Sequence, residues 1–270
     1  MAFNADLHVH LALPEKELTD EQIKEKLSRF KDAGVTFLRD GGDAYGVSLR
    51  AKSIAEELGI DYRTPVFAIY KEGRYGSFLG KSFGTFDEYK ALVDEAEASG
   101  ADFIKLILSG VVDLKSGEND FEPFFTSEEV SSMVGYAHGK GFSVMAHVNG
   151  AENIKMALSA GVDTIEHGYF MDEQCADMLA SSDVVWVPTI AAVAAFVGNK
   201  EYDQAALAKI LADHAKMIKK VWYIGGMIGL GTDNADLEKE YEILKAAIDD
   251  REFDAHLETA LAHVRWKFTK

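Results

Sequence analysis

The chain has 270 residues, of which 47% are hydrophobic, and this is enough for a large core. It carries 28 Lys and Arg against 45 Asp and Glu, which gives a formal net charge of −17. That charge argues against nucleic acid and anionic membranes as partners, because both would be repelled.

The amino-terminal stretch MAFNADLHVH has no basic start, no uninterrupted apolar run and no small-residue cleavage site. No later run approaches the roughly 18 apolar residues that span a bilayer. The single cysteine, Cys175, cannot form an internal disulfide, and we expect it to be a small core residue. We therefore expect a cytoplasmic protein.

Eight short apolar or β-branched runs predict strands, most of them followed by a helical pattern. The runs cover residues 3–10, 35–41, 61–70, 101–108, 142–148, 162–168, 184–190 and 227–233. Capping residues such as Thr19 and Thr126 open helical stretches at 18–34 and 126–141, and residues 85–100 repeat the pattern. The segments 236–250 and 256–268 read as closing helices.

Eight βα units of this length predict one domain, residues 1–270, folded as an α/β (β/α)8 TIM barrel. The alternative is a doubly wound open sheet. No G-x-G-x-x-G occurs at a strand-to-helix turn, so the phosphate-binding fingerprint often carried by that fold is missing.

Polar residues recur near the carboxyl ends of the predicted strands, where the chemistry of such barrels lies. They are His8, His10, Lys105, His147, His167 and Asp233. His8 and His10 are two residues apart on a strand and therefore share a face, although such a pair is also common as ordinary core histidines. Gly229 and Gly231, in phase with Asp233, are expected to leave the inner face open. Four further histidines fall in predicted helices and are expected to be structural: His138, His214, His256 and His263.

Lys105 stands out because it lies within the near-continuous apolar run FIKLIL. Lysine is almost never fully buried without a partner. Its stem could pack while the ammonium group reaches the barrel mouth. Alternatively, burial and nearby cations lower its pKa and leave an amine that can react or be modified.

Five motifs together resemble the amidohydrolase superfamily, in its branch with a carboxylated lysine between two metal ions. They are D-L-H-V-H, F-I-K, A-H, I-E-H-G and G-T-D, in the family's order along the chain. The segments GVTFLRDGG, TIEHGYFMDE and VWVPTI are similar to imidazolonepropionase-like and prolidase-like members. The family's common flanking β-sandwich is not evident here.

The resemblance implies that His8, His10 and Asp233 hold one zinc ion and that His147 and His167 hold a second. It implies that Lys105, as a carbamate derived from carbon dioxide, bridges the two ions. Imidazole and carboxylate are normal zinc ligands, and two metals sharing a water supply hydroxide near neutral pH. By the same resemblance, Asp233 takes a proton from that water and passes it to the leaving nitrogen.

Substrate choice is expected in the loops after the strands. In the loop at 70–84, Arg74 and Tyr75, with Lys81, offer positive charge and an aromatic surface. Our hypothesis is that Arg74 binds a substrate carboxylate, the alternative being a solvated loop. Tyr169, after the His167-Gly168 turn, is a second candidate for substrate contact.

The sequence therefore predicts a metal-dependent hydrolase that cleaves a C–N bond in a small amide, lactam or dipeptide. A phosphotriesterase-like or lactonase activity and a non-catalytic metal-binding barrel are the alternatives. A mononuclear deaminase is disfavoured, because such relatives generally lack the strand-four lysine. Arg39 and Asp40 end the second strand, where an internal ion pair and a catalytic role are both open. We expect a small-molecule substrate and, on base rates alone, a homo-oligomer.

Overall fold

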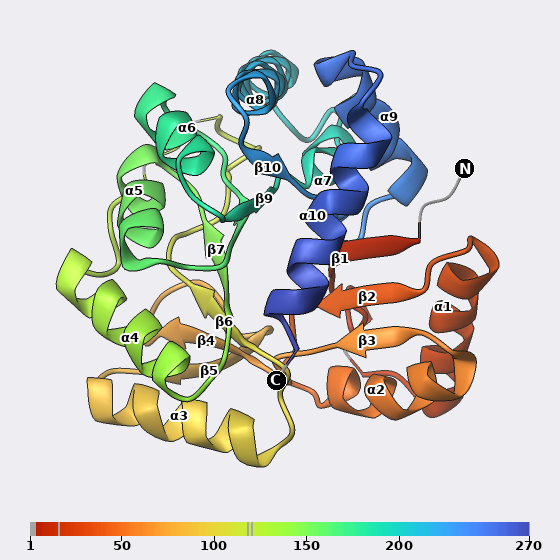
Figure 1. Ribbon diagram of the computed structural model, residues 1–270, viewed down its shortest axis with the longest axis vertical. Coiled ribbons are helices and arrows are strands. Elements are labelled where there is room, and N and C mark those ends of the chain that lie inside the picture. Colours follow the sequence, from red (N-terminus) through yellow and green to blue (C-terminus); the bar gives the residue numbers. More distant parts are fainter. Residues whose placement is uncertain (1–3, 16, 118, 120, 270) are drawn as a thin grey trace.

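The computed structural model describes residues 4–15, 17–117, 119 and 121–269, in which strands and helices alternate (Figure 1). The strands are β1 (Ala5–Val9), β2 (Phe37–Asp40), β3 (Asp61–Arg63), β4 (Ala68–Lys71), β5 (Gly80–Phe83), β6 (Ile104–Ile107), β7 (Val144–Val148), β8 (Thr164–His167), β9 (Val185–Val187) and β10 (Met227–Ile228). The helices are α1 (Asp20–Asp32), α2 (Val47–Leu58), α3 (Phe86–Ala98), α4 (Ser127–Gly139), α5 (Ala151–Ala160), α6 (Glu173–Ala180), α7 (Ile190–Ala194), α8 (Gln204–Tyr223), α9 (Leu237–Ile248) and α10 (Phe253–Lys267). Within this part of the chain, no helix has the length and apolar character needed to cross a membrane.

The strands follow the order of a (β/α)8 barrel, as the sequence predicts. All of their described pairings are parallel, in one sheet of order β1-β2-β3 and another of order β10-β9-β8-β7-β6-β4-β5. Backbone hydrogen bonds join both edges of the smaller sheet to segments of the larger one: Leu7 N in β1 donates to Leu230 O, after β10 (2.9 Å), and Asp102 N, before β6, donates to Thr64 O, after β3 (2.9 Å). The carboxyl ends of β1 and of the larger sheet therefore face a common mouth.

Helix starts follow from local chemistry. Thr19, Thr85 and Thr126 each accept a hydrogen bond from the backbone N–H three residues later, and the side chain at that later position bonds back. These reciprocal capping boxes satisfy backbone donors that the first helical turn leaves free. They confirm the predicted starts of α1, α3 and α4.

The predicted third strand, 61–70, is wrong in its continuity. It is broken into β3 and β4 around Pro65, which has no N–H to donate, and Val66, whose φ is 67°. The expected loop at 70–84 also contains a strand, because β5 pairs in parallel with β4. A Cβ atom at Gly80 would lie 1.8 Å from the Ala68 carbonyl oxygen, so this close pairing requires glycine.

The seventh and eighth strands are shorter than predicted. β9 ends at Val187, since Thr189 adopts a φ of 49° and α7 begins directly after it. β10 covers only Met227–Ile228, although the backbone N–H groups of Thr232 and Asp233 still donate to His8 O.

The expectation that Gly229 and Gly231 leave an open inner face is wrong. A Cβ at Gly229 would meet Leu7 Cδ1 at 2.7 Å, and one at Gly231 would meet Val187 Cγ1 at 2.5 Å. The glycines instead let the chain after β10 pack directly against β1 and β9.

Helix α10 closes the end of the barrel opposite the mouth, and it crosses the centre of the view in Figure 1. Its apolar face packs with inward residues of several strands, in a cluster made of Ala5, Leu7, Phe37, Phe103, Met145, Val185, Val187, Ala260, Leu261, Val264 and Phe268. Above this cluster, the guanidinium carbon of Arg39 lies 4.6 Å from the centre of the Phe268 ring. The apolar floor thus gives way to a polar layer toward the mouth.

Candidate metal centre

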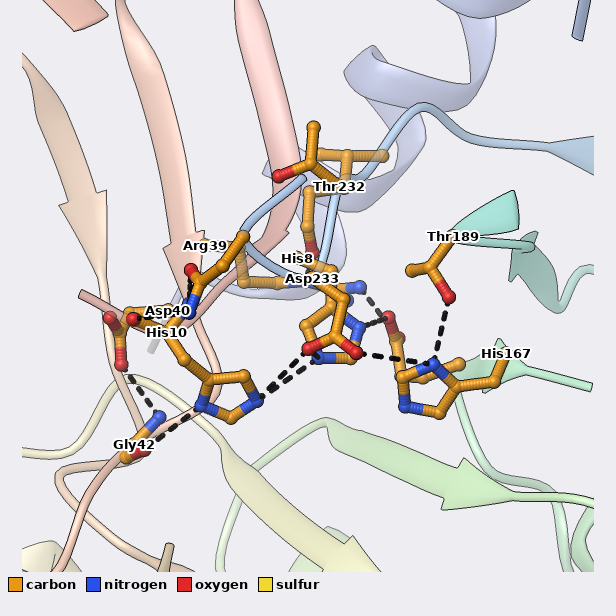
Figure 2. Close-up of polar contacts among 12 residues, drawn as sticks. His8, His10, Arg39, Asp40, Gly42, His167, Thr189, Thr232 and Asp233 are labelled. Carbon is orange, nitrogen blue, oxygen red and sulfur yellow. Dashed lines mark hydrogen bonds and ion pairs between the residues drawn. The ribbon is translucent and has the colours of Figure 1, made fainter. Parts of the chain in front are cut away.

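Five predicted residues come together where their strands end. His8 and His10 come from β1 and the residue after it, while Asp233 comes from the turn beyond β10. One ligand atom from each of these three lies within 4.8 Å of the others. In Figure 2 the Asp233 carboxylate overlaps the His8 ring, with the His10 ring on one side and the His167 ring on the other. The ring centres of His147 and His167 are 4.5 Å apart.

The hydrogen bonds of His8 and His10 fix which nitrogen faces the cluster. Nδ1 of His8 lies 2.7 Å from Glu166 Oε2, and Nδ1 of His10 lies 3.2 Å from Gly42 O. Both partners are acceptors, so we assign the ring protons to Nδ1 and lone pairs to both Nε2 atoms. The two Nε2 atoms are 3.3 Å apart. Two lone pairs this close repel each other unless a cation lies beside them.

Both rings are neutral as well as buried. Burial, and then the charge of Lys105, lower the pKa of His10 to about 3 and hold the pKa of His8 well below its usual value. A neutral imidazole is the form that binds metal.

Asp233 supplies the negative charge of this group. Its Oδ1 lies 3.7 Å from Nε2 of both His8 and His10, and its Oδ2 lies 3.9 Å from Nδ1 of His167. Burial raises its pKa to about 7, although the charge of Lys105 opposes the shift. Its φ of 49° is rare for a residue other than glycine, and such strain often occurs at functional sites.

The second pair of histidines is held from outside the cluster. Nε2 of His147 lies 3.2 Å from Gly110 O, and Nδ1 of His167 lies 2.8 Å from Thr189 Oγ1. His167 has a φ of 68°, so its backbone is strained as well. The turn before α7 thus orients one of the predicted ligands.

Lys105 is 1% exposed, and its Nζ has no hydrogen-bond partner among the described residues. Burial, followed by the charge of Arg39, lowers its pKa to about 8, although Glu166 opposes the shift. Its charge contributes to the lowered pKa of all four clustered histidines, and its strand β6 pairs with β7, which carries His147. A buried ammonium without a partner is costly, which favours the neutral amine.

Glu166 is a residue whose role the sequence reasoning missed. Its Oε2 accepts from His8, while its Oε1 accepts from Arg39 (2.7 Å) and Thr164 (2.5 Å). Of the two interpretations that the sequence leaves open for Arg39 and Asp40, the structure shows an internal ion pair for Arg39. Arg39 pairs with Glu166, whereas Asp40 accepts from the backbone N–H groups of Leu11 and Gly42. Like Lys105 in FIKLIL, Glu166 is a charged residue inside a buried strand, and this pattern could have identified it from the sequence.

A cavity of about 290 Å³ opens above the cluster and includes His10, His147, His167 and Asp233 in its lining. Tyr75 and Tyr169 line it, as candidates for substrate contact should. The Tyr169 hydroxyl, however, donates to Thr189 O at 3.4 Å. Arg74 is exposed and lies over the Phe124 ring at 4.9 Å, outside the described lining of this cavity.

The remaining histidines lie in helices, as predicted: His138 in α4, His214 in α8, and His256 and His263 in α10. None belongs to the described lining of the cavity. Cys175 is fully buried and unpaired, which confirms its expected place in the core.

Known proteins share this architecture. The ochratoxinase of Aspergillus niger is 28% identical over 141 residues, which cover 50% of this chain and 29% of that protein. An uncharacterized protein of Mycobacterium bovis is 25% identical over 203 residues, 72% of this chain and 51% of its own. The match thus spans about half or less of each curated relative.

Solved structures extend the similarity to nearly the whole chain. The A. niger ochratoxinase structure matches with a TM-score of 0.77 at 22% identity, over 94% of this chain and 68% of that one. A Xaa-Pro dipeptidase with bound methionine in its active site matches with a TM-score of 0.70 at 25% identity, over 94% and 74% of the two chains. Residues 5–263 match the model of the amidohydrolase family. This chain belongs to the amidohydrolase family.

Proposed function

We propose that this protein is a metal-dependent hydrolase that cleaves the C–N bond of a small amide, lactam or dipeptide-like substrate. One observation carries the proposal: two imidazole lone pairs and a carboxylate converge, with ligand atoms of His8, His10 and Asp233 within 4.8 Å of one another. Convergent nitrogen and oxygen donors of this kind suit zinc.

The other clustered residues fit a second metal ion. His147 and His167 lie beside the first group, and the buried Lys105, whose Nζ has no hydrogen-bond partner among the described residues, comes from β6, the strand that pairs with the strand of His147. Loss of one proton from the ammonium group gives the neutral amine. Its addition to carbon dioxide forms an N–C bond and releases a second proton, so two protons go to solvent and the buried cation becomes an anion. Two zinc ions would be held by His8, His10 and Asp233 and by His147 and His167, and Lys105 as a carbamate would supply anionic oxygen ligands to them.

Two bound metal ions supply hydroxide near neutral pH and polarise the substrate carbonyl. The chain's own residues orient the metal-binding rings and transfer protons. Glu166 holds the His8 ring through Nδ1, and Thr189 holds the His167 ring. The Asp233 carboxylate, close to both rings, takes a proton and delivers it to the leaving nitrogen, acting first as base and then as acid.

The substrate class has support from charge and from similarity. The similarity to a Xaa-Pro dipeptidase favours an amide or peptide-like bond. The net charge of −17 favours a small molecule over nucleic acid or an anionic membrane.

Metal content per chain, measured by elemental analysis after expression with zinc and bicarbonate, tests the proposal. We expect two zinc ions in the parent, with a sharp fall in Lys105→Ala and in His10→Ala. His263→Ala, which removes a histidine from α10, is the matched control and should retain both ions. One ion in both the parent and Lys105→Ala would contradict the bridge. A loaded protein inert toward amide, ester and phosphotriester panels would contradict the activity.

A further inference from the structure

Apolar side chains from three segments make up much of the lining of the cavity above the metal centre. One wall comes from the segment between β4 and β5, with Tyr75 and Phe78. A second comes from the loop between β6 and α4, with Val111 and Val112, and a third from α7 and the turn after it. Groups on both sides of a bond held at the centre would therefore meet hydrocarbon.

The polar side chains in this lining are mostly engaged with the protein. Asn234 accepts from His10 N and donates to His10 O, both at 2.8 Å. Asn149 accepts from Tyr169 N and donates to Gly110 O. Apart from the predicted metal ligands, Thr189 bonds His167, the Tyr169 hydroxyl donates to Thr189 O, and Tyr75 contributes a neutral phenol. Little is left to orient a charged substituent of a substrate.

No Lys or Arg belongs to the described lining of the cavity. The cations of the neighbouring segment have other partners. Arg74 lies over the Phe124 ring, Lys71 donates to Phe124 O at 2.6 Å, and Lys81 donates to Glu95. A carboxylate held against these walls, away from the metal centre, would lose hydration without gaining a Lys or Arg partner, which is unfavourable.

We infer that this cavity selects neutral amides with apolar groups on both sides of the scissile bond and disfavours amides that carry a carboxylate. The inference rests on the proposed function and narrows its substrate class. It replaces the hypothesis that Arg74 binds a substrate carboxylate.

Val111 is the position at which this preference can be changed. It lines the cavity, yet it is 49% exposed, so a longer side chain can be accommodated without disturbing the core. Val111→Lys would place an ammonium group at the rim of the cavity. Val197→Lys is the matched control, because Val197 is 62% exposed and lies outside the described lining of the cavity. Both variants change the net charge equally.

The probes are N-acetylphenethylamine and N-acetyl-L-phenylalanine, which share the scissile amide and differ by one carboxylate. With zinc-loaded protein, we expect kcat/KM for the neutral probe to be higher by at least about tenfold. Val111→Lys should reduce the ratio of kcat/KM for the neutral probe to kcat/KM for the anionic probe severalfold. Val197→Lys should leave this ratio unchanged.

Equal or better turnover of the anionic probe by the parent would overturn the inference, as would equal shifts in the two lysine variants. If neither probe is hydrolysed, the inference is tested by measuring the binding affinity of each probe for the same zinc-loaded protein by calorimetry. Tighter binding of the neutral probe would support the inference while the proposed activity fails. Equal or weaker binding would reject the inference.

Discussion

Glu166 Oε2 lies 2.7 Å from Nδ1 of His8, and both side chains are fully buried. This contact directs the lone pair of His8 Nε2 toward His10 and Asp233. The same carboxylate is paired with Arg39, so one residue links the polar layer of the barrel to the metal centre. Carboxylates behind metal-binding histidines set both ring orientation and basicity.

Replacing Glu166 with Gln should therefore weaken zinc binding by about 10- to 100-fold. The amide can donate to Nδ1, which would move the ring proton to Nε2 and remove the ligand lone pair. The measurement is the zinc dissociation constant by chelator competition. Arg39→Met is the comparison variant. It breaks the buried pair and should lower the free energy of unfolding by about 3–5 kcal/mol, but it leaves the His8 acceptor in place. Unchanged zinc affinity in Glu166→Gln would show that the contact does not orient His8.

His214 should make stability depend on pH. Its ring is buried, its Nε2 lies 3.2 Å from Pro188 O, and burial lowers its pKa from 6.5 to about 3. Below about pH 6.5 the unfolded chain binds a proton at this site that the folded chain does not. The free energy of unfolding therefore falls with decreasing pH, by about 1.4 kcal/mol per unit from this group.

Urea unfolding of the parent and His214→Phe between pH 8 and pH 4 isolates this effect. The variant loses the hydrogen bond to Pro188 and should be less stable at pH 8. The difference in free energy of unfolding between the parent and the variant should shrink as the pH falls below 6.5, because only the parent has a histidine at this position that is protonated in the unfolded chain. Parallel curves across the whole range would refute the assignment.

Structural features that arise from neighbouring residues could be predicted from the sequence, whereas features that depend on distant residues could not. The alternation of His8 and His10, and a lysine inside FIKLIL, point to the barrel mouth because strand periodicity is a local property. The pairing of Glu166 with Arg39 joins residues 127 positions apart, and it follows from strand register across the barrel. The break at Val66 and the turn at Thr189 depend on left-handed backbone at β-branched residues, which propensity does not anticipate.

Asp163 anchors the carboxyl-terminal helix that closes the barrel floor. Its carboxylate accepts from His138 Nε2 (2.9 Å) and Val144 N (2.7 Å), and Lys267 Nζ lies 3.1 Å from it. Burial alone would raise its pKa, but these contacts outweigh burial and hold the pKa below 3.8. The ionised Asp163 carboxylate therefore contributes to the free energy of unfolding above pH 3.8. This contribution is lost as the pH falls through the lower pKa that Asp163 has in the folded protein.

Asp163→Asn should lower the free energy of unfolding at pH 7 by about 1–3 kcal/mol, measured by denaturant titration. As the pH falls below 3.8 and through the lower folded pKa of Asp163, the difference from the parent should narrow, since the parent carboxylate becomes protonated as well. Asp183→Asn is the control, because Asp183 also pairs with Lys267 but its side chain is 67% exposed. A loss as large in Asp183→Asn would mean that the ion pair with Lys267, rather than the buried contacts of Asp163, carries the effect.

Gly231 connects the packing of the last strand to the metal centre. A Cβ at this position would lie 2.5 Å from Val187 Cγ1 and 2.8 Å from His8 N, so Gly231→Ala must push β1 away from the turn that carries Asp233. Overpacking of this kind costs about 1–3 kcal/mol of stability, and the displaced His8 should also bind zinc more weakly. Gly135→Ala is the matched control, since a Cβ at that position of α4 would meet no described atom within 4 Å and alanine should stabilise the helix by about 0.5–1 kcal/mol. Thermal unfolding and chelator competition on both variants check the two effects. A Gly231→Ala protein with parental zinc affinity would show that the spacing between β1 and the Asp233 turn does not set the geometry of the ligands.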